Sequence, residues 1–311
     1  MLPYHSIARS SAALCLLFSL AMLGAPCVAQ KKGTTERTLE SGGVERQFLL
    51  HIPRRYKQVS KKTAVPLVIM LHGRTGSGKV AASPYYGWKR LADKEDFVVA
   101  FPTALGSPTS WKGAWRGKPT ADSVFLAELI DLLKAELKID EDHVYMTGHS
   151  SGGYMSFSFA VTHGDRVAAI APVAGLAVSR AKPKLPVSLI SFHGMADNVV
   201  PYDKSRMGTP NAPASAALFA KHNGCDDVER TELNKGKVHL DQWKDGDAGT
   251  EVAFYSIEGG GHGWPQGGRK SVAATELIWA FFVAHPRRAA EDAAEGEPKP
   301  KEKAKRSRRD R

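Results

Sequence analysis

The sequence has few cysteines, no long hydrophobic run and no internal repeat, and each shortage excludes a class of protein. Only 3 cysteines occur in 311 residues, namely Cys15, Cys27 and Cys225. The first two lie in an N-terminal segment that we expect to be removed, and one remaining thiol excludes a disulfide-stapled domain. The stability of the mature chain must therefore come from a hydrophobic core, which 42% hydrophobic residues can supply.

The most apolar stretch near the N-terminus, residues 12–23, is too short for a comfortable membrane span and follows one positive residue. Small residues come next. This pattern predicts a secretory signal peptide at residues 1–29, with cleavage after Ala29. A lipid anchor on Cys27 is the less favoured alternative, because a proline stands where a lipoprotein signal places a small residue. We therefore expect a secreted or periplasmic protein with no integral membrane span after signal removal.

The C-terminal segment, residues 287–311, has almost no large apolar side chain and carries 10 Lys and Arg against 6 Asp and Glu. Such a segment cannot bury enough surface to offset the entropy of ordering, so we predict a disordered basic tail. It contributes to the formal net charge of +11. A solvated terminus is the favoured interpretation, and electrostatic attachment to an anionic surface is the alternative.

Between these ends, residues 30–286 alternate between strand-like and helix-like segments, and no insert is large enough to mark a second domain. Continuous Val, Ile and Leu runs alternating with helices predict an α/β domain, with a mostly parallel sheet covered by helices on both faces. Strands are expected at residues 46–53, 66–73, 96–103, 143–148, 167–175, 186–194 and 251–260, and helices at residues 123–137, 151–163, 214–222 and 272–285.

The segment "GHSSGG" at residues 148–153 carries the clearest catalytic signal. It fits G-x-S-x-G between a predicted strand and a predicted helix, and its glycines permit a tight turn that exposes Ser150. The motif alone is a modest signal, because Gly/Ser-rich turns match it by chance. The strand-turn-helix context favours Ser150 as a nucleophile over an ordinary helix cap.

A serine hydroxyl needs a base within hydrogen-bond reach and a carboxylate to orient that base. Asp197 and His262 each follow a late strand, and ligand-binding residues of such sheets lie beyond the carboxyl ends of the strands. Asp203 lies in the same loop as Asp197 and is the alternative acid, further from the strand end. Three other histidines lie near strand ends, and we expect them to pack or orient: His72, His149 and His193.

The loop after the strand at residues 66–73 has two interpretations. Gly73 to Lys79 fits the G-x-x-x-x-G-K pattern of a phosphate-binding loop, but Val80 stands where Ser or Thr should bind magnesium. Pro84 also disfavours the required helix, so we expect no nucleotide. In the alternative, the backbone N–H groups of Arg74 and Ser151 form an oxyanion hole.

Together these segments resemble the secreted α/β-hydrolase esterases, which include extracellular polyhydroxybutyrate depolymerases and feruloyl and acetylxylan esterases. The resemblance covers residues 38–285 and rests on these motifs: "PLVIMLHG", "DSVFLAELIDLL", "IDEDHVYMTGHSSGGYM", "FHGMADNVVPY", "HNGC" and "GGGHGWPQG". It implies the α/β-hydrolase fold, with Ser150, Asp197 and His262 as nucleophile, acid and base.

The sequence departs from this family at two places. Many relatives have cysteine where Arg74 stands, so the pocket near the acyl oxygen differs here. Relatives with "NGC" often pair that cysteine with another before the strand "EVAFYSI", but no cysteine occurs there, and we expect Cys225 to be a free, buried thiol.

The resulting prediction is a secreted serine carboxylic-ester hydrolase that acts on polymer-linked or polysaccharide-linked esters, of the feruloyl, acetyl or polyhydroxyalkanoate type. Trp115, Tyr154 and Trp264 are candidates to line the substrate cleft, with core packing as the equal alternative. No metal or organic cofactor is implied. The alternative function is a catalytically inactive hydrolase-fold module that binds polymer or cell envelope.

Overall fold

The computed structural model describes residues 32–114, 117–177, 180–205 and 209–287. The predicted signal peptide and nearly all of the predicted tail lie outside these ranges, so both stay predictions. None of the helices in the described ranges is both long and apolar enough to cross a bilayer.

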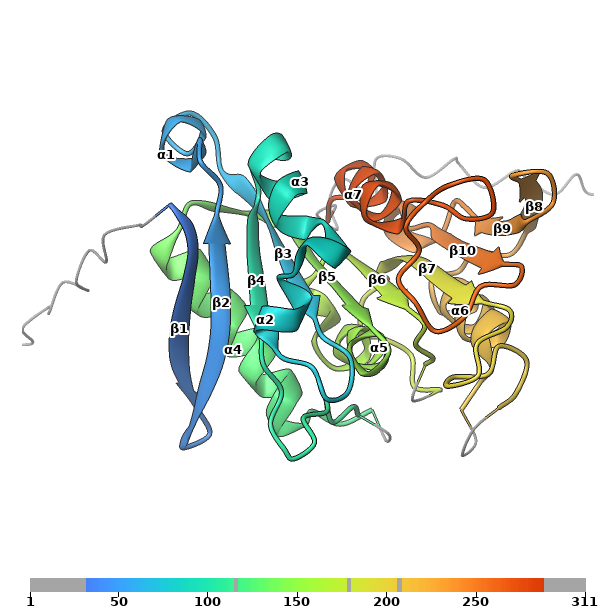
Figure 1. The fold of residues 1–311 in the computed structure, drawn as a ribbon, viewed down its shortest axis with the longest axis horizontal. Coiled ribbons are helices and arrows are strands. Elements are labelled where there is room, and N and C mark those ends of the chain that lie inside the picture. Colours follow the sequence, from blue (N-terminus) through green and yellow to red (C-terminus); the bar gives the residue numbers. More distant parts are fainter. Residues whose placement is uncertain (1–31, 115–116, 178–179, 206–208, 288–311) are drawn as a thin grey trace, which may run out of the picture.

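A ten-stranded sheet runs through the described residues in the order β1-β2-β4-β3-β5-β6-β7-β10-β9-β8 (Figure 1). Its strands are β1 (Gly33–Ser41), β2 (Val44–Ile52), β3 (Val65–Leu71), β4 (Val98–Pro102), β5 (Ile139–His149), β6 (Ala169–Val173), β7 (Ser188–Gly194), β8 (Val228–Leu233), β9 (Val238–Trp243) and β10 (Val252–Ile257). The six central strands from β4 to β10 are parallel, whereas β1, β2, β8 and β9 add antiparallel pairs at the two edges. The predicted mostly parallel sheet is confirmed.

Helices cover both faces of this sheet (Figure 1). The α-helices are α1 (Tyr56–Val59), α2 (Gly78–Ala81), α3 (Trp88–Glu95), α4 (Ala121–Glu136), α5 (Ser151–His163), α6 (Ala212–His222) and α7 (Ala274–Ala284), and the 3₁₀ helices are η1 (Pro84–Tyr86), η2 (Gly164–Arg166) and η3 (Asp247–Gly249). Helices α4, α5 and α6 pack on one face, while α2, α3 and α7 pack on the other.

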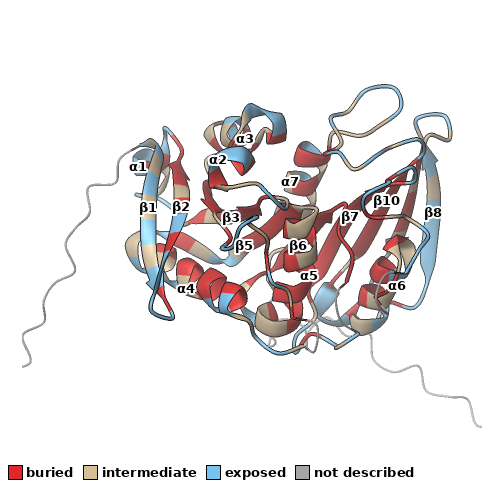
Figure 2. Ribbon diagram, turned by 60° about the horizontal axis from the view of Figure 1, so that its bottom comes forward, coloured by how far each residue is buried: buried red, intermediate tan, exposed pale blue. Residues whose placement is uncertain are grey.

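Two hydrophobic clusters form the core, one on each face of the sheet. In β3, Leu67 and Ile69 belong to the cluster under α4 and α5, whereas Val68 and Met70 belong to the other. Because successive side chains of a strand point to opposite faces, an unbroken apolar run is what a strand buried on both sides requires. The central strands are accordingly buried along their length in Figure 2.

The two edge strands, β1 and β8, were not predicted from the sequence. Both are rich in charged and hydroxyl side chains, and their residues are mostly exposed or half-buried (Figure 2). Charged side chains on an edge strand discourage pairing with a second chain. The same polarity removes the apolar pattern by which a strand is recognised, so these strands escape a hydrophobicity-based prediction.

Candidate active site

Ser150 lies in the turn between β5 and α5, in a backbone conformation that few side-chain-bearing residues adopt, with φ 54° and ψ −116°. Its N–H donates to the carbonyl of Val173 at 2.8 Å, and its own carbonyl accepts from the N–H of Tyr154 at 3.0 Å. A strained residue persists only where its surroundings over-determine it. These bonds at both ends of the residue hold the turn in place.

Glycines make this turn possible because the backbone of α5 lies directly on the sheet. A Cβ on Gly148 would lie 2.5 Å from the carbonyl carbon of Gly152, and a Cβ on Gly152 would lie 2.5 Å from the carbonyl oxygen of Leu71. Both distances are far shorter than any real carbon contact. The glycines of "GHSSGG" are therefore required by close approach, which the sequence indicated only as freedom to turn.

The structure brings Ser150, His262 and Asp197 into one hydrogen-bonded chain. Nε2 of His262 lies 2.8 Å from Oγ of Ser150, and Nδ1 of His262 lies 2.7 Å from Oδ2 of Asp197. The three residues follow β5, β10 and β7, which lie close together in the parallel part of the sheet (Figure 1). This geometry suits a hydroxyl whose proton passes to an imidazole held by a carboxylate.

Asp197 is buried, and its carboxylate is fully hydrogen-bonded. Oδ1 accepts from the backbone N–H groups of Val199 and Val200, both at 2.8 Å, while Oδ2 faces His262. The alternative acid, Asp203, is exposed, and its contact with Asn211 is made by its backbone carbonyl. The structure thus brings the first of the two aspartates to the imidazole.

His193 lies beneath the same carboxylate. Its Nε2 donates to the carbonyl of Val200 at 2.8 Å and lies 3.5 Å from Oδ2 of Asp197. Burial lowers the pKa of His193 below its ordinary value, against the smaller opposing effects of the hydrogen bond to Val200 and the charge of Asp197. The neutral ring therefore supports the aspartate loop, which is the packing role expected for it.

His149, the residue before the serine, holds the histidine loop from below. Its Nε2 donates to the backbone carbonyl of His262 at 2.9 Å, and its Nδ1 accepts from the hydroxyl of Tyr86 at 3.3 Å. Burial lowers the pKa of His149 to about 4, with a further lowering by the neighbouring His262. The ring is therefore neutral near pH 7, as its two hydrogen bonds require.

Tyr85 and Tyr86 of η1 complete the support of this loop, and no sequence pattern indicated their role. The hydroxyl of Tyr85 accepts from the N–H of Trp264 at 3.0 Å, and the side-chain amide of Gln266 donates to the carbonyl of Tyr85 at 2.9 Å. In the sequence analysis, this segment contributed only Pro84, as an argument against a phosphate-binding helix. The role of Tyr85 depends on its hydrogen bonds with Trp264 and Gln266, about 180 residues further along the chain.

The loop after β3 runs beside the serine, where the sequence predicted half of an oxyanion hole. A Cβ on Gly73 would lie 3.5 Å from Cβ of Ser150. His72 fixes this loop, because its Nδ1 donates to the carbonyl of Gly73 at 2.7 Å and its Nε2 accepts from the N–H of Ala104 at 3.0 Å. Burial lowers the pKa of His72, so the neutral ring can make both bonds.

The two backbone N–H groups predicted to bind an oxyanion, those of Arg74 and Ser151, have no hydrogen-bond acceptor within the described parts of the chain. Ser151 opens α5, where backbone donors have no partner within the helix. Its side chain is held in place by the N–H of Trp111 at 3.1 Å. The side chain of Arg74 is exposed, and no described carboxylate pairs with it.

The three aromatic residues predicted to line a substrate cleft have different outcomes. Trp115 lies outside the described residues. Tyr154 is partly buried and packs against the core cluster on the α5 face. Trp264 is only 3% exposed, and its indole N–H donates to Oγ1 of Thr275 at 2.9 Å. For Trp264 the structure therefore favours core packing, the alternative left open by the sequence.

Cys225 is a free and buried thiol, as predicted. No group of three or more His, Cys, Asp and Glu side chains in the described residues is arranged to hold a metal ion.

Comparison with known proteins identifies the same architecture. A family model described as the alpha/beta hydrolase fold matches residues 66–223. A probable feruloyl esterase C of Aspergillus terreus is 26% identical over 275 residues, covering 85% of this chain and 95% of that protein. The bifunctional acetylxylan esterase/xylanase XynS20E of Neocallimastix patriciarum is 28% identical over 223 residues, covering 70% of this chain and 30% of that protein.

Among solved structures, an acetyl xylan esterase from Aspergillus awamori superimposes with a TM-score of 0.63 at 16% identity, covering 80% of this chain and 99% of that one. A likeness at this identity concerns the fold.

Proposed function

Because the chain belongs to the α/β-hydrolase fold family, we propose that it is a serine carboxylic-ester hydrolase in which Ser150, His262 and Asp197 are the catalytic residues. The observation that carries this proposal is the continuous hydrogen-bonded chain from Oγ of Ser150 through the imidazole of His262 to the buried carboxylate of Asp197. A fold alone does not specify a reaction, but an activated nucleophile at the rim of the sheet does.

In the proposed mechanism, Oγ of Ser150 attacks the ester carbonyl carbon while Nε2 of His262 takes the hydroxyl proton. Asp197 holds Nδ1–H of the imidazole, which fixes the tautomer and stabilises the imidazolium that forms. The negative oxygen of the tetrahedral intermediate accepts from the N–H groups of Arg74 and Ser151. His262 then protonates the leaving alcohol, and a water molecule attacks the acyl-serine by the same route in reverse.

We further propose that the ester is linked to a polysaccharide of the plant cell wall, as a feruloyl or acetyl substituent. The support is the similarity to proteins named feruloyl esterase and acetylxylan esterase over most of the chain. A polymer of this kind is met outside the cell, which agrees with the predicted signal peptide and a secreted protein. The basic tail would then be available to contact an anionic surface.

Hydrolysis of 4-nitrophenyl acetate, methyl ferulate and acetylated xylan by the wild type and by Ser150→Ala tests this function. We expect the variant to lose at least about 10⁴-fold in kcat, because it lacks the nucleophile while its fold is retained. Unchanged circular dichroism and melting temperature would show that the fold survives. Equal rates for the two proteins on all three esters would leave the inactive binding module as the better interpretation.

A further inference from the structure

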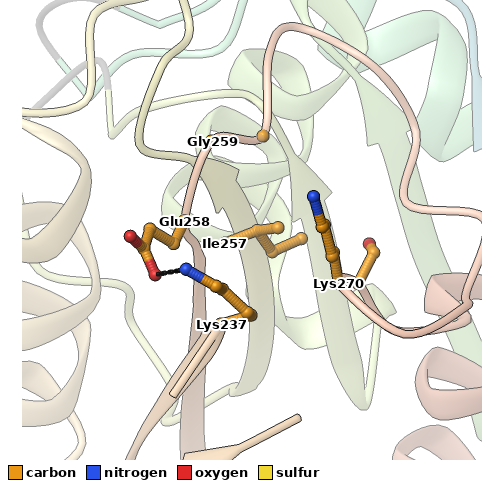
Figure 3. A pocket seen from close by; sticks show the side chains of 7 residues that line it. Lys237, Ile257, Glu258, Gly259 and Lys270 are labelled. Carbon is orange, nitrogen blue, oxygen red and sulfur yellow. Dashed lines mark hydrogen bonds and ion pairs between the residues drawn. The ribbon is translucent and has the colours of Figure 1, made fainter. Parts of the chain in front are cut away.

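A cavity beside the loop that carries His262 is lined by two lysines and one glutamate. Its volume is about 340 Å³, and it is lined by three separate segments: the turn between β8 and β9, the end of β10, and the loop before α7. Figure 3 shows Lys237 and Lys270 on opposite sides of Ile257, with Gly259 above them. The proposed mechanism uses none of these side chains.

The charges of the cavity leave one cation without an internal partner. Nζ of Lys237 lies 3.0 Å from Oε2 of Glu258, and this ion pair is half exposed (Figure 3). Lys270 is exposed and forms no ion pair with any carboxylate of the described residues. The lining therefore carries two ammonium groups and one carboxylate, and one further anion bound in the cavity would restore neutrality.

The backbone at the mouth of the cavity adds potential donors. The N–H groups of Gly259 and Gly261 have no acceptor within the described residues, whereas that of Gly260 donates to Ile257. A Cβ on Gly259 or on Gly261 would meet no atom within 4 Å, so this part of the chain is open to an approaching ligand. Backbone N–H groups of such glycine-rich segments commonly bind anions.

The cavity lies close to the catalytic loop. A neighbouring cavity of about 270 Å³ shares Ile257, Gly260 and Ser271 with it, and extends to Gly261 and Gly263 on either side of His262. Gly259 and His262 are three positions apart in the chain, so their Cα atoms are at most about 11 Å apart.

We propose that this cavity is a carboxylate-binding subsite that takes an acidic sugar unit of the polysaccharide carrying the scissile ester. The inference rests on the proposed function, since it concerns the chain to which the ester is attached. Lys270 and Lys237 bind the carboxylate, and the amide of Gly259 supplies a directed hydrogen bond. The subsite favours acidic polysaccharides over neutral ones without contacting the reacting atoms.

Direct binding to the full-length Ser150→Ala protein tests the subsite without turnover. Isothermal titration would use trigalacturonate as the acidic probe, xylotriose as the neutral probe and inorganic phosphate as a free anion. We expect Lys270→Gln and Lys237→Gln each to weaken binding of trigalacturonate about five-fold, the scale of a partly exposed charge contact, and to leave xylotriose unchanged. Glu258→Gln should strengthen trigalacturonate binding by a similar factor, because it frees Lys237.

Lys244→Gln is the matched control, because Lys244 forms a comparable ion pair, with Glu229 at 3.2 Å, on the same hairpin but outside this cavity. It removes the same charge and should leave trigalacturonate binding unchanged. The proposal is overturned if Lys270→Gln behaves like Lys244→Gln, or if Glu258→Gln weakens binding. Equal affinity for phosphate and trigalacturonate would also overturn it, since the cavity would then bind free anions and not a sugar chain.

These outcomes are separate from those of the esterase test. An esterase that fails to bind trigalacturonate would retain the proposed function and lose the subsite. A protein that binds the acidic trimer through both lysines but hydrolyses no ester would keep the binding site and lose the catalytic assignment.

Discussion

The two halves of the proposed catalytic centre, the serine turn and the histidine loop, are held in place by different physical means. The serine turn is fixed by backbone packing, since no Cβ fits at Gly148 or Gly152 and the backbone of Ser150 between them is strained. The histidine loop, in contrast, is open at Gly259 and Gly261, and several of the hydrogen bonds that hold it come from side chains. Steric fixation tolerates no added atom, whereas side-chain hydrogen bonds can be removed one at a time.

The bonds that hold the histidine loop come from three separate parts of the chain. His149 bonds the carbonyl of His262, Tyr85 bonds both backbone groups of Trp264, and the N–H of Ala196 bonds the carbonyl of Gly260. We therefore expect changes in the serine turn to act on folding, and changes around the histidine loop to act on rate.

Among changes to the residues that support the histidine loop, removing the charge of Asp197 gives the largest expected effect on rate. Asp197→Asn keeps the size of the side chain but offers an N–H group where Nδ1–H of His262 needs an acceptor, so the imidazole adopts the wrong tautomer. We expect kcat for 4-nitrophenyl acetate to fall about 10⁴-fold. Asp203→Asn is the matched control and should stay within two-fold of wild type. Comparable losses in the two variants would contradict the assignment of the acid.

Gly152→Ala tests the steric half. The added methyl would lie 2.5 Å from the carbonyl oxygen of Leu71, whose position is fixed because Leu71 pairs with Gly148 in the central sheet. We expect a destabilisation of more than about 4 kcal/mol, measured as the free energy of unfolding in urea. Gly261→Ala adds the same methyl in open space and should change stability by less than about 1 kcal/mol. A stable, folded Gly152→Ala would remove the distinction between the two halves.

Low pH should weaken the contact between the serine turn and the histidine loop and so lower the free energy of unfolding. The reason is that His149 belongs to the serine turn but bonds the histidine loop. Its pKa is about 4 in the folded protein and near 6.5 when unfolded, so the folded state binds fewer protons. Its contribution to stability is complete above pH 6.5 and is lost as the pH falls towards 4. Linkage gives a loss of about 3 kcal/mol between pH 7.5 and 4.

Urea unfolding at a series of pH values measures this loss, and His149→Gln isolates it. The variant lacks the titrating ring, so the free energy of unfolding should depend less steeply on pH below 6.5 than in wild type. Identical slopes for the two proteins would show that His149 titrates normally in the folded state, contrary to its buried position.

Cutting the bond from His149 to the histidine loop should have the smallest of these effects. His149→Leu fills the space but cannot donate to the carbonyl of His262, and a displacement of the imidazole by about 1 Å costs up to about 100-fold in rate. We expect kcat to fall 10- to 100-fold with KM within two-fold, and His149→Gln to recover part of the loss through its amide N–H.

Thr147→Val controls for general destabilisation of β5, because it removes the 2.6 Å bond from Thr147 to Ala171 without touching the histidine loop. If Thr147→Val lowers kcat as much as His149→Leu does, the bond to His262 has no specific role.

The sequence predicts most of the central sheet because burial leaves a clear pattern there. The run predicted at residues 66–73 is apolar up to Leu71, and the structure contains this part as β3 between two hydrophobic layers. Helix α5 was predicted with its observed bounds, since the motif before it fixes its start. Strand β9 escaped prediction together with the edge strands, and α3 was missed because its core contact uses only three side chains.

Of the candidate site, the sequence indicates the three residues that meet but not what holds them. Their position follows from strand ends, which sequence patterns locate. The bond from His149 to His262 depends instead on the path of a glycine-rich loop, and no local pattern fixes that path. The orientation of Trp264 into the core also depends on the path of this loop, because its partner Thr275 lies in the first turn of α7.

The buried thiol of Cys225 is a built-in probe of local opening in the folded chain. Its thiol is 5% exposed, and burial raises its pKa to about 11, so it reacts with alkylating reagents only when the surrounding structure opens. The thiol lies just past α6, where the ideal Cβ of Gly246 would come within 2.6 Å of its sulfur. The rate of thiol alkylation therefore measures how often the structure around Cys225 unfolds locally.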